Sequence, residues 1–176
     1  MATNYTKARQ NVPPGWVYLG DNLKRYLLGQ PSDKNILIFG VNPSTATPQQ
    51  PDPTIKKVLK ILDKHFNGYG WIMMNIFPQV TPNPQDLIYD QNLESENLQV
   101  LDFICKKFTI EKIWCAWGNL IDSKVFLHNC QQNIFSCLKN QNQNQNYQFI
   151  HYGALTKKNN PRHPLYMSLN NNFISL

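Results

Sequence analysis

The stretch that most constrains the fold of this chain runs from Asn35 to Ala46 and reads NILIFGVNPSTA. Ile36 to Phe39 is an unbroken apolar run with no polar side to expose to water, so it predicts a short strand buried on both faces. Gly40 then predicts a turn. In an open α/β sheet, the carboxyl end of such a strand faces the crevice in which ligands bind. We therefore expect the turn residues to lie in the functional site: Val41, Asn42, Pro43 and Ser44.

Three later apolar runs also stop at polar or glycine-containing turns, and they predict three further strands. These are Trp71–Phe77, Ile110–Trp117 and Tyr147–Tyr152. Strands that alternate with helical patterns predict an α/β fold of three layers, α/β/α, around a mainly parallel four-stranded sheet. The carboxyl ends of parallel strands meet at one edge of a sheet, so we expect the four following turns to converge on one site.

Three helical patterns separate these strands. The first begins at Asp52, a predicted N-cap, followed by Pro53 at the first helical position. The other two span Leu93–Phe108 and Asp122–Leu138, and a short helix is expected after the basic loop that ends near Pro164. The asparagine- and glutamine-rich tract at 140–145 predicts a solvated loop.

The length of 176 residues predicts a single domain over 1–176. We expect 35–168 to form its core and 1–34 to be a peripheral N-terminal segment. Within that segment, Trp16–Leu19 and Lys24–Leu28 predict either a hairpin or a strand followed by a short helix.

The formal net charge of +6 and a pI near 9.1 favour a polyanionic partner such as nucleic acid. No apolar run approaches the roughly 20 residues needed to span a bilayer, and the polar start does not resemble a signal peptide, so we expect a cytoplasmic monomer without membrane contact. The cysteines contain no CxxC pair and are expected to be buried thiols, with no metal and no other cofactor. They are Cys105, Cys115, Cys130 and Cys137.

Asn75 is the most informative residue of the second apolar run, because it is an amide among hydrophobic neighbours. A buried amide must find hydrogen-bond partners or it costs about 1–3 kcal/mol. Either the protein supplies them, with Asn75 tying down a neighbouring loop, or a ligand does.

Four motifs resemble the DUF1643 family, a domain of unknown function. They are Gly40-Val-Asn-Pro-Ser-Thr-Ala46, Asp52-Pro-Thr54, Ala116-Trp-Gly118, and Leu155-Thr-Lys157 with Pro161-Arg-His-Pro-Leu-Tyr166. The resemblance covers about residues 35 to 168. The chain is also similar, more weakly, to the thymine- and mismatch-directed branch of the uracil-DNA glycosylase superfamily.

The glycosylase resemblance implies a role for each matching residue. Asn42 in the first motif, with Gly40, would orient the hydrolytic water, and Asn75 would read a flipped base on its pairing edge. Trp117 and Gly118 would close the third strand. His163, or alternatively Asn160, would occupy the last motif near the base carbonyl or the glycosidic oxygen.

Two departures from the superfamily pattern affect this site. Neither His163 nor Asn160 is followed by the expected serine. The aromatic residue that stacks on the base after the first motif is also missing, and Phe77, Tyr69 or Trp71 would have to replace it.

Charged residues complete the expected site. Asp52 is either a helix cap or a catalytic base that assists Asn42. Lys157, Lys158 and Arg162 form either a clamp on DNA phosphates or an ordinary solvated turn.

These features predict a DNA glycosylase that hydrolyses the N-glycosidic bond of a flipped pyrimidine, in duplex DNA or in a single strand, and leaves an abasic site. In strict uracil enzymes a tyrosine follows the motif proline and blocks groups on carbon 5, whereas this chain has Ser44. We therefore expect a base with a bulky C5 group, such as hydroxymethylcytosine or its glucosylated form in phage DNA, and a role in antiphage defence. The alternatives are a non-catalytic reader of modified or single-stranded nucleic acid, a nucleoside or nucleotide hydrolase and, less attractively, a metal-dependent nuclease.

Overall fold

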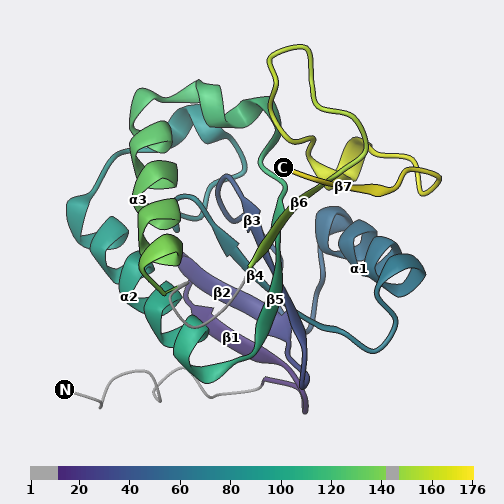
Figure 1. Ribbon diagram of the computed structural model, residues 1–176. Coiled ribbons are helices and arrows are strands. Elements are labelled where there is room, and N and C mark those ends of the chain that lie inside the picture. The colour runs from purple at the N-terminus through teal and green to yellow at the C-terminus, as the bar shows by residue number, and fades with distance from the viewer. Residues whose placement is uncertain (1–11, 142–146) are drawn as a thin grey trace.

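The computed structural model describes residues 12–141 and 147–176, which form three layers (Figure 1). A sheet of seven strands lies between one helix on one face, α1 (Pro53–His65), and two helices on the other, α2 (Gln91–Lys107) and α3 (Val125–Gln141). The strands are β1 (Val17–Gly20), β2 (Arg25–Gln30), β3 (Asn35–Gly40), β4 (Gly70–Asn75), β5 (Ile110–Cys115), β6 (Gln148–Tyr152) and β7 (Phe173–Ser175). Three short 3₁₀ helices complete the fold: η1 (Pro84–Asp86), η2 (Gly118–Ser123) and η3 (Pro164–Tyr166).

The strand order is β1-β2-β4-β3-β5-β6-β7. Strands β4, β3, β5 and β6 pair in parallel, and these are the four strands that the apolar runs predict. Strands β1, β2 and β7 pair antiparallel at the two sides. The sheet is therefore mixed and seven-stranded, and the expectation of a mainly parallel sheet of four strands is not confirmed. The added strands flank the parallel centre, whose outer edges would otherwise be unpaired.

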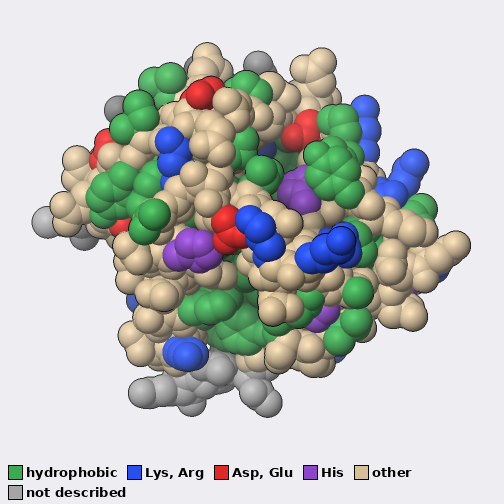
Figure 2. All heavy atoms as spheres, turned by 90° about the horizontal axis from the view of Figure 1, so that it is seen from above, with side chains coloured by type: hydrophobic (Ala, Val, Ile, Leu, Met, Phe, Trp, Pro, Cys, Tyr) green, Lys and Arg blue, Asp and Glu red, His purple; other side chains and the backbone are tan. Residues whose placement is uncertain are grey.

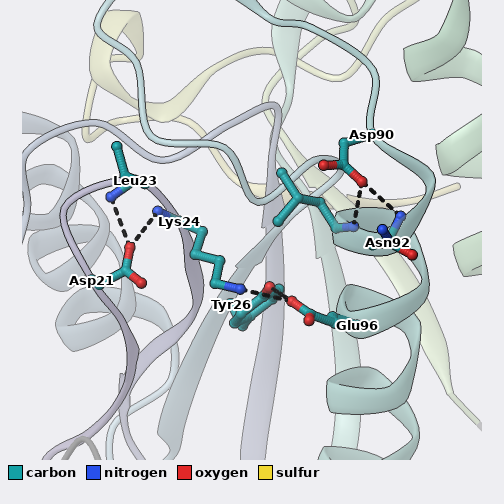
Figure 3. A network of polar contacts seen from close by, with 8 residues as sticks. Asp21, Leu23, Lys24, Tyr26, Asp90, Asn92 and Glu96 are labelled. Atoms are coloured by element: carbon teal, nitrogen blue, oxygen red, sulfur yellow. Dashed lines mark hydrogen bonds and ion pairs between the residues drawn. The ribbon is translucent and has the colours of Figure 1, made fainter.

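Part of the segment at 1–34, which was expected to be peripheral, forms two strands at one side of the sheet, at residues 17–30. Strands β1 and β2 form an antiparallel hairpin, and β2 is buried against β4. A polar network ties this hairpin to α2 (Figure 3). Lys24 Nζ pairs with Glu96 at 2.9 Å, and the Tyr26 hydroxyl donates a hydrogen bond to the same carboxylate. Asp21 accepts hydrogen bonds from the backbone of Leu23 and Lys24 and so fixes the hairpin turn.

Two hydrophobic cores result from this layering. One lies between the sheet and α2 with α3, and it contains Leu37, Phe39 and Phe77. The other lies between the sheet and α1, and it contains Ile36 and Ile38, which alternate with Leu37 and Phe39 along β3. Because successive side chains of a strand point to opposite faces, β3 contributes to both cores, as a strand buried on both faces must.

Helix α1 begins as the sequence predicts: the Asp52 carboxylate accepts a hydrogen bond from the Ile55 backbone N–H at 2.8 Å, and Pro53 takes the first helical position. The predicted start of the third helix at Asp122 is wrong, because η2 occupies 118–123 and Lys124 is extended. The short helix expected after the basic loop is only the 3₁₀ turn η3. In the 140–145 tract, residues 140 and 141 belong to α3 and 142–145 lie outside the described residues.

Burial of the cysteine thiols is confirmed for Cys105, Cys115 and Cys130, and Cys137 is partly buried. Among the helices of the described residues, none has the length and apolar character that a membrane span requires.

Candidate functional site

The turns that follow β3, β4 and β5 converge at one edge of the sheet. Backbone hydrogen bonds connect them: Ile76 N–H donates to Gly40 O at 2.9 Å, and Ala116 N–H donates to Phe39 O at 2.9 Å. Gly118 N–H donates to Pro161 O at 2.8 Å, which joins the end of β5 to the long loop after β6. The convergence follows from the parallel pairing of the central strands.

A pocket of about 420 Å³ lies between η2 and the loop after β6. Three of its lining residues, Gly118, Arg162 and His163, are candidates from the sequence. The others are Asn119, Leu120, Thr156 and Tyr166. The loops around it face the viewer in Figure 2, where Lys, Arg and His side chains lie among hydrophobic ones.

His163 is held against the end of β5. Residue 118 has a positive φ of 64°, and a Cβ atom there would lie 3.1 Å from the Cβ of His163, so glycine permits this close approach. The Nδ1 atom of His163 is buried and has no hydrogen-bond partner among the described residues. Burial lowers the pKa of His163 below 6.5, and the nearby Asp52 carboxylate partly opposes that shift. His163 is therefore a neutral imidazole at pH 7, with one ring nitrogen unused.

Asn75 ends β4 at the same edge and is 1 % exposed. Neither its amide nitrogen nor its amide oxygen has a hydrogen-bond partner among the described residues. Met73 and Trp71, two and four positions earlier, belong to the core under α1, so Asn75 faces that side of the sheet. A Cβ atom at Gly40 would lie 2.9 Å from the Asn75 Oδ1 atom. The lack of a side chain at Gly40 thus leaves room for this amide, but Asn75 does not line the pocket that contains His163.

Asn42 has a structural task that the sequence did not indicate. Its amide nitrogen donates to Pro43 O at 3.0 Å and to Thr81 O at 2.8 Å, which ties the turn after β3 to the loop after β4. Val41 and Pro43 are buried, and Ser44 is partly buried. None of these four turn residues lines the pocket of His163.

Phe77 does not fit the role of a stacking aromatic. It is fully buried and packs against Phe126 at a ring-centroid distance of 5.1 Å. Tyr69 and Trp71 lie at the amino end of β4, at the opposite edge of the sheet. Tyr166 is the aromatic residue that lines the pocket; it is 82 % exposed, and its ring centroid lies 5.7 Å from that of His163.

Asn160, the alternative to His163, is directed elsewhere. Its amide donates to Asn119 Oδ1 at 3.2 Å and to Asp122 Oδ2 at 3.1 Å, and it does not line the pocket. Lys158 Nζ lies 3.6 Å from the same Asp122 carboxylate. Of these two residues, His163 therefore lines the pocket and Asn160 does not.

The remaining cations of this loop are exposed. Arg162 lines the pocket, and its Nε donates to Ala154 O at 2.9 Å, which leaves its terminal nitrogens for another acceptor. Lys157 is exposed beside it. No group of three or more His, Cys, Asp or Glu side chains within the described parts of the chain is arranged to hold a metal ion.

Arg25 is a residue that the sequence reasoning missed. It is 3 % exposed, and its Nη1 atom donates to Ala46 O, in the turn after β3, at 2.9 Å. An arginine that follows Lys24 is expected at the surface from the sequence alone, so only the structure reveals its burial.

A family model described as "Protein of unknown function (DUF1643)" matches residues 25–165. The chain belongs to this family. The DUF1643 match begins at Arg25 and includes β2, so it extends further toward the N-terminus than the motifs at 40–46 and beyond. No curated protein and no solved structure matches the chain, so these comparisons give no support to the expected resemblance to uracil-DNA glycosylases.

Proposed function

We propose that this DUF1643 protein is a monofunctional DNA glycosylase, which hydrolyses the N-glycosidic bond of a flipped, C5-modified pyrimidine and leaves an abasic site. The observation that carries the proposal is a pair of polar side chains near one sheet edge, the buried Asn75 and the partly buried His163, whose buried amide and Nδ1 atoms lack partners among the described residues. Native proteins satisfy most such groups internally, so exceptions favour a ligand that completes them. An amide and an imidazole are the groups that a pyrimidine edge would engage.

The pocket beside His163 suits such a ligand in size and lining. Its 420 Å³ falls within the range of about 300–1,000 Å³ that is typical of small-molecule sites. Tyr166 offers an exposed aromatic face at the pocket wall, and stacking on an aromatic side chain contributes about 1–3 kcal/mol per base. In this proposal Tyr166 takes the stacking role for which the sequence offered Phe77, Tyr69 or Trp71.

The chemistry of glycosidic cleavage fits the residues at this edge. Breaking the bond builds negative charge on the departing base and positive charge on the sugar. A donor aimed at that base, His163 in this proposal, would stabilise the transition state by about 3–4 kcal/mol. Asp52 lies close enough to act electrostatically on His163, and it is the carboxylate that we assign to orienting the attacking water.

Binding of DNA would use the cations of the loop after β6. Arg162 and Lys157 are exposed next to the pocket, where phosphates beside a flipped nucleotide would lie. Lys158 contributes less, because Asp122 already faces it. A DNA substrate also implies a cytoplasmic location, and we propose that the protein acts as a monomer.

The substrate class follows from the turn after β3. By the glycosylase resemblance, Ser44 replaces the tyrosine that blocks groups on carbon 5, so we propose that hydroxymethylcytosine and its glucosylated form are accepted, although Ser44 does not line the pocket of His163 in the free protein. Because such bases occur in phage DNA, excision would serve antiphage defence.

The test is incubation of the protein, in excess, with duplexes that contain cytosine, uracil, hydroxymethylcytosine or glucosylated hydroxymethylcytosine. Strands that break only after alkali indicate abasic sites, and equal yields with and without chelator separate this activity from a nuclease. His163→Ala should abolish breakage, whereas Lys106→Ala, on the far face of α2, should not. Absence of abasic sites on every duplex would refute the proposal, and cleavage of free nucleoside alone would indicate a nucleoside hydrolase.

A non-catalytic reader of modified DNA is the second candidate, and one observation favours it. The Asn42 amide nitrogen is engaged by two backbone carbonyls, so Asn42 has a purely structural use in the free protein. A reader would bind the modified duplex tightly with no base release at any enzyme excess. A glycosylase would release the base.

A further inference from the structure

The pocket has two walls, and polar contacts join them. One wall is η2, at the end of β5, and the other is the loop after β6 with η3. The Thr156 hydroxyl of the loop donates to Asn119 Oδ1 at 2.7 Å, and Gly118 N–H donates to Pro161 O at 2.8 Å. The placement of the loop against η2 therefore decides where His163 stands in the pocket.

Asp122, in η2, is the carboxylate on which further contacts between these walls converge. Its Oδ2 atom accepts a hydrogen bond from Asn160 Nδ2 at 3.1 Å and lies 3.6 Å from Lys158 Nζ. Its Oδ1 atom lies 3.1 Å from His128 Nε2, on α3. The Asp122 side chain is 28 % exposed, so water screens these contacts only in part. One carboxylate thus connects the loop after β6 both to η2 and to α3.

The backbone of the loop presents Asn160 to this carboxylate. Asn159 has a positive φ of 61°, and its N–H donates to Thr156 O at 2.9 Å, while Thr156 N–H donates to Asn160 O at 2.9 Å. The loop therefore closes on itself in a tight turn directly before Pro161. A contact made at Asn160 is thus passed through a short, internally bonded segment to His163, three residues later.

We propose that Asp122 is a positioning residue of the candidate site. By holding Asn160 and Lys158, its carboxylate fixes the loop after β6 against η2. The loop in turn presents His163 and Arg162 to the pocket. Asp122 itself does not line the pocket and does not touch the base. The inference rests on the proposed function, in which an imidazole of this loop donates to the departing base.

The charge of Asp122 opposes binding of DNA. It has the sign of a phosphate, and it occupies the Lys158 ammonium, which could otherwise face a phosphate. Removal of the carboxylate should therefore leave DNA affinity unchanged or raise it, while the loop loosens and the rate of the reaction falls. A general structural role would instead lower both quantities.

Hydrogen exchange of backbone amides in the free protein tests the positioning without any activity. Gly118 N–H donates to Pro161 O and so reports contact between the two walls, whereas Ala116 N–H donates to Phe39 O within the sheet. Asp122→Ala should speed exchange at Gly118 by about threefold to tenfold and leave Ala116 unchanged. An unchanged rate at Gly118 would overturn the proposal, and so would an equal rise at Ala116, which would indicate destabilisation of the whole domain.

Two further variants identify the contacts responsible. Asp122→Asn keeps an oxygen that can accept from Asn160 but loses the charge, so exchange at Gly118 should rise less than in Asp122→Ala. Asp102→Ala removes a carboxylate that is paired with Lys106 on α2, at 2.6 Å, and should leave Gly118 at the wild-type rate. If Asp102→Ala speeds exchange at Gly118 as much as Asp122→Ala does, the effect is not specific and the proposal is wrong.

Single-turnover excision from a duplex that contains hydroxymethylcytosine connects the positioning to the reaction. With the protein at saturation, Asp122→Ala should release the base about fivefold more slowly, while its dissociation constant for the duplex stays within about twofold of wild type or falls. An unchanged rate, or equal losses of rate and affinity, would overturn the proposal. If exchange at Gly118 changes as expected but wild type releases no base, the proposed function fails and the positioning of His163 by Asp122 stands.

Discussion

Asn75→Leu is the substitution that most directly tests whether the site awaits a ligand. The two unpartnered amide atoms of Asn75 are buried, and a buried group without a partner costs about 1–3 kcal/mol. Leucine has the same branched shape without polar atoms but is larger, and overpacking of a tight site costs about 1 kcal/mol or more. Taking about 2 kcal/mol for the relieved penalty, we expect a net gain of about 1 kcal/mol.

The matched control is Asn97→Leu, because Asn97 is a buried asparagine whose amide is used. It is 2 % exposed, and its Nδ2 atom donates to the backbone carbonyl of Asn75 at 2.9 Å. Losing that bond should cost about 1–3 kcal/mol. Thermal unfolding should therefore show a rise of about 2–4 °C for Asn75→Leu and a fall for Asn97→Leu.

This reasoning is refuted if stability falls both in Asn75→Leu and in a second variant, Asn75→Ala. Asn75→Ala removes the same amide without adding volume, so a loss seen only in the leucine variant would reflect overpacking. A loss of about 2 kcal/mol in both would mean that the free protein already satisfies the Asn75 amide. Asn75→Leu should in addition abolish base excision, whatever its stability.

Three further predictions concern single substitutions. Gly118→Ala should lower stability by about 1–3 kcal/mol in urea unfolding, because φ is +64° and the new Cβ would press on His163; unchanged stability would show that His163 can move away. Burial keeps the folded-state pKa of His163 below 6.5, the usual value in the unfolded chain. The contribution of the neutral imidazole to folding stability is therefore complete above pH 6.5 and is lost as the pH falls below that value. Wild type should therefore lose stability relative to His163→Gln between about pH 7.5 and about pH 5.5, and parallel profiles would contradict the burial effect. Burial and, after it, the hydrogen bond to Glu96 raise the pKa of Tyr26 to about 12, so Glu96→Gln should lower that pKa in an ultraviolet titration while burial keeps it above 10, and it should cost about 0.5–1 kcal/mol; an unaltered titration would exclude the contact in Figure 3.

The sequence predicted the centre of the fold better than its sides. Unbroken apolar runs such as 36–39 and 71–77 indicate buried parallel strands, because a strand covered by helices on both faces of the sheet has no side chain in contact with water. Strand β7 has three residues, two of them exposed, so its pattern has no period to recognise. Arg25 at the start of β2 is misleading in the sequence, because a charged residue indicates an exposed position whereas Arg25 is buried.

The two candidate site residues with unpartnered atoms were selected by contrast with their neighbours. Asn75 and His163 stand out from their neighbours in the sequence, and the structure finds unpartnered atoms on both. The choice between Asn160 and His163 could not be made from the sequence, since both flank the same Pro161-Arg162 pair. The structure distinguishes them because the turn around Asn159, with φ of 61°, directs Asn160 to Asp122.

The positions of His163 and Asn75 limit how one base could contact both side chains. His163 borders an open pocket, whereas Asn75 is sealed at 1 % exposure on the α1 side of the sheet. For one base to reach both side chains, the turn between Pro43 and Asp52 must shift, because it carries Ala46, which packs in the core on that same side. The hydrogen bond from Arg25 to Ala46 and the bond from Asn42 to Thr81 then oppose entry of the base. A base that offers additional contacts to compensate for these bonds would enter more readily than unmodified cytosine, so the closed turn itself would favour a substituted pyrimidine.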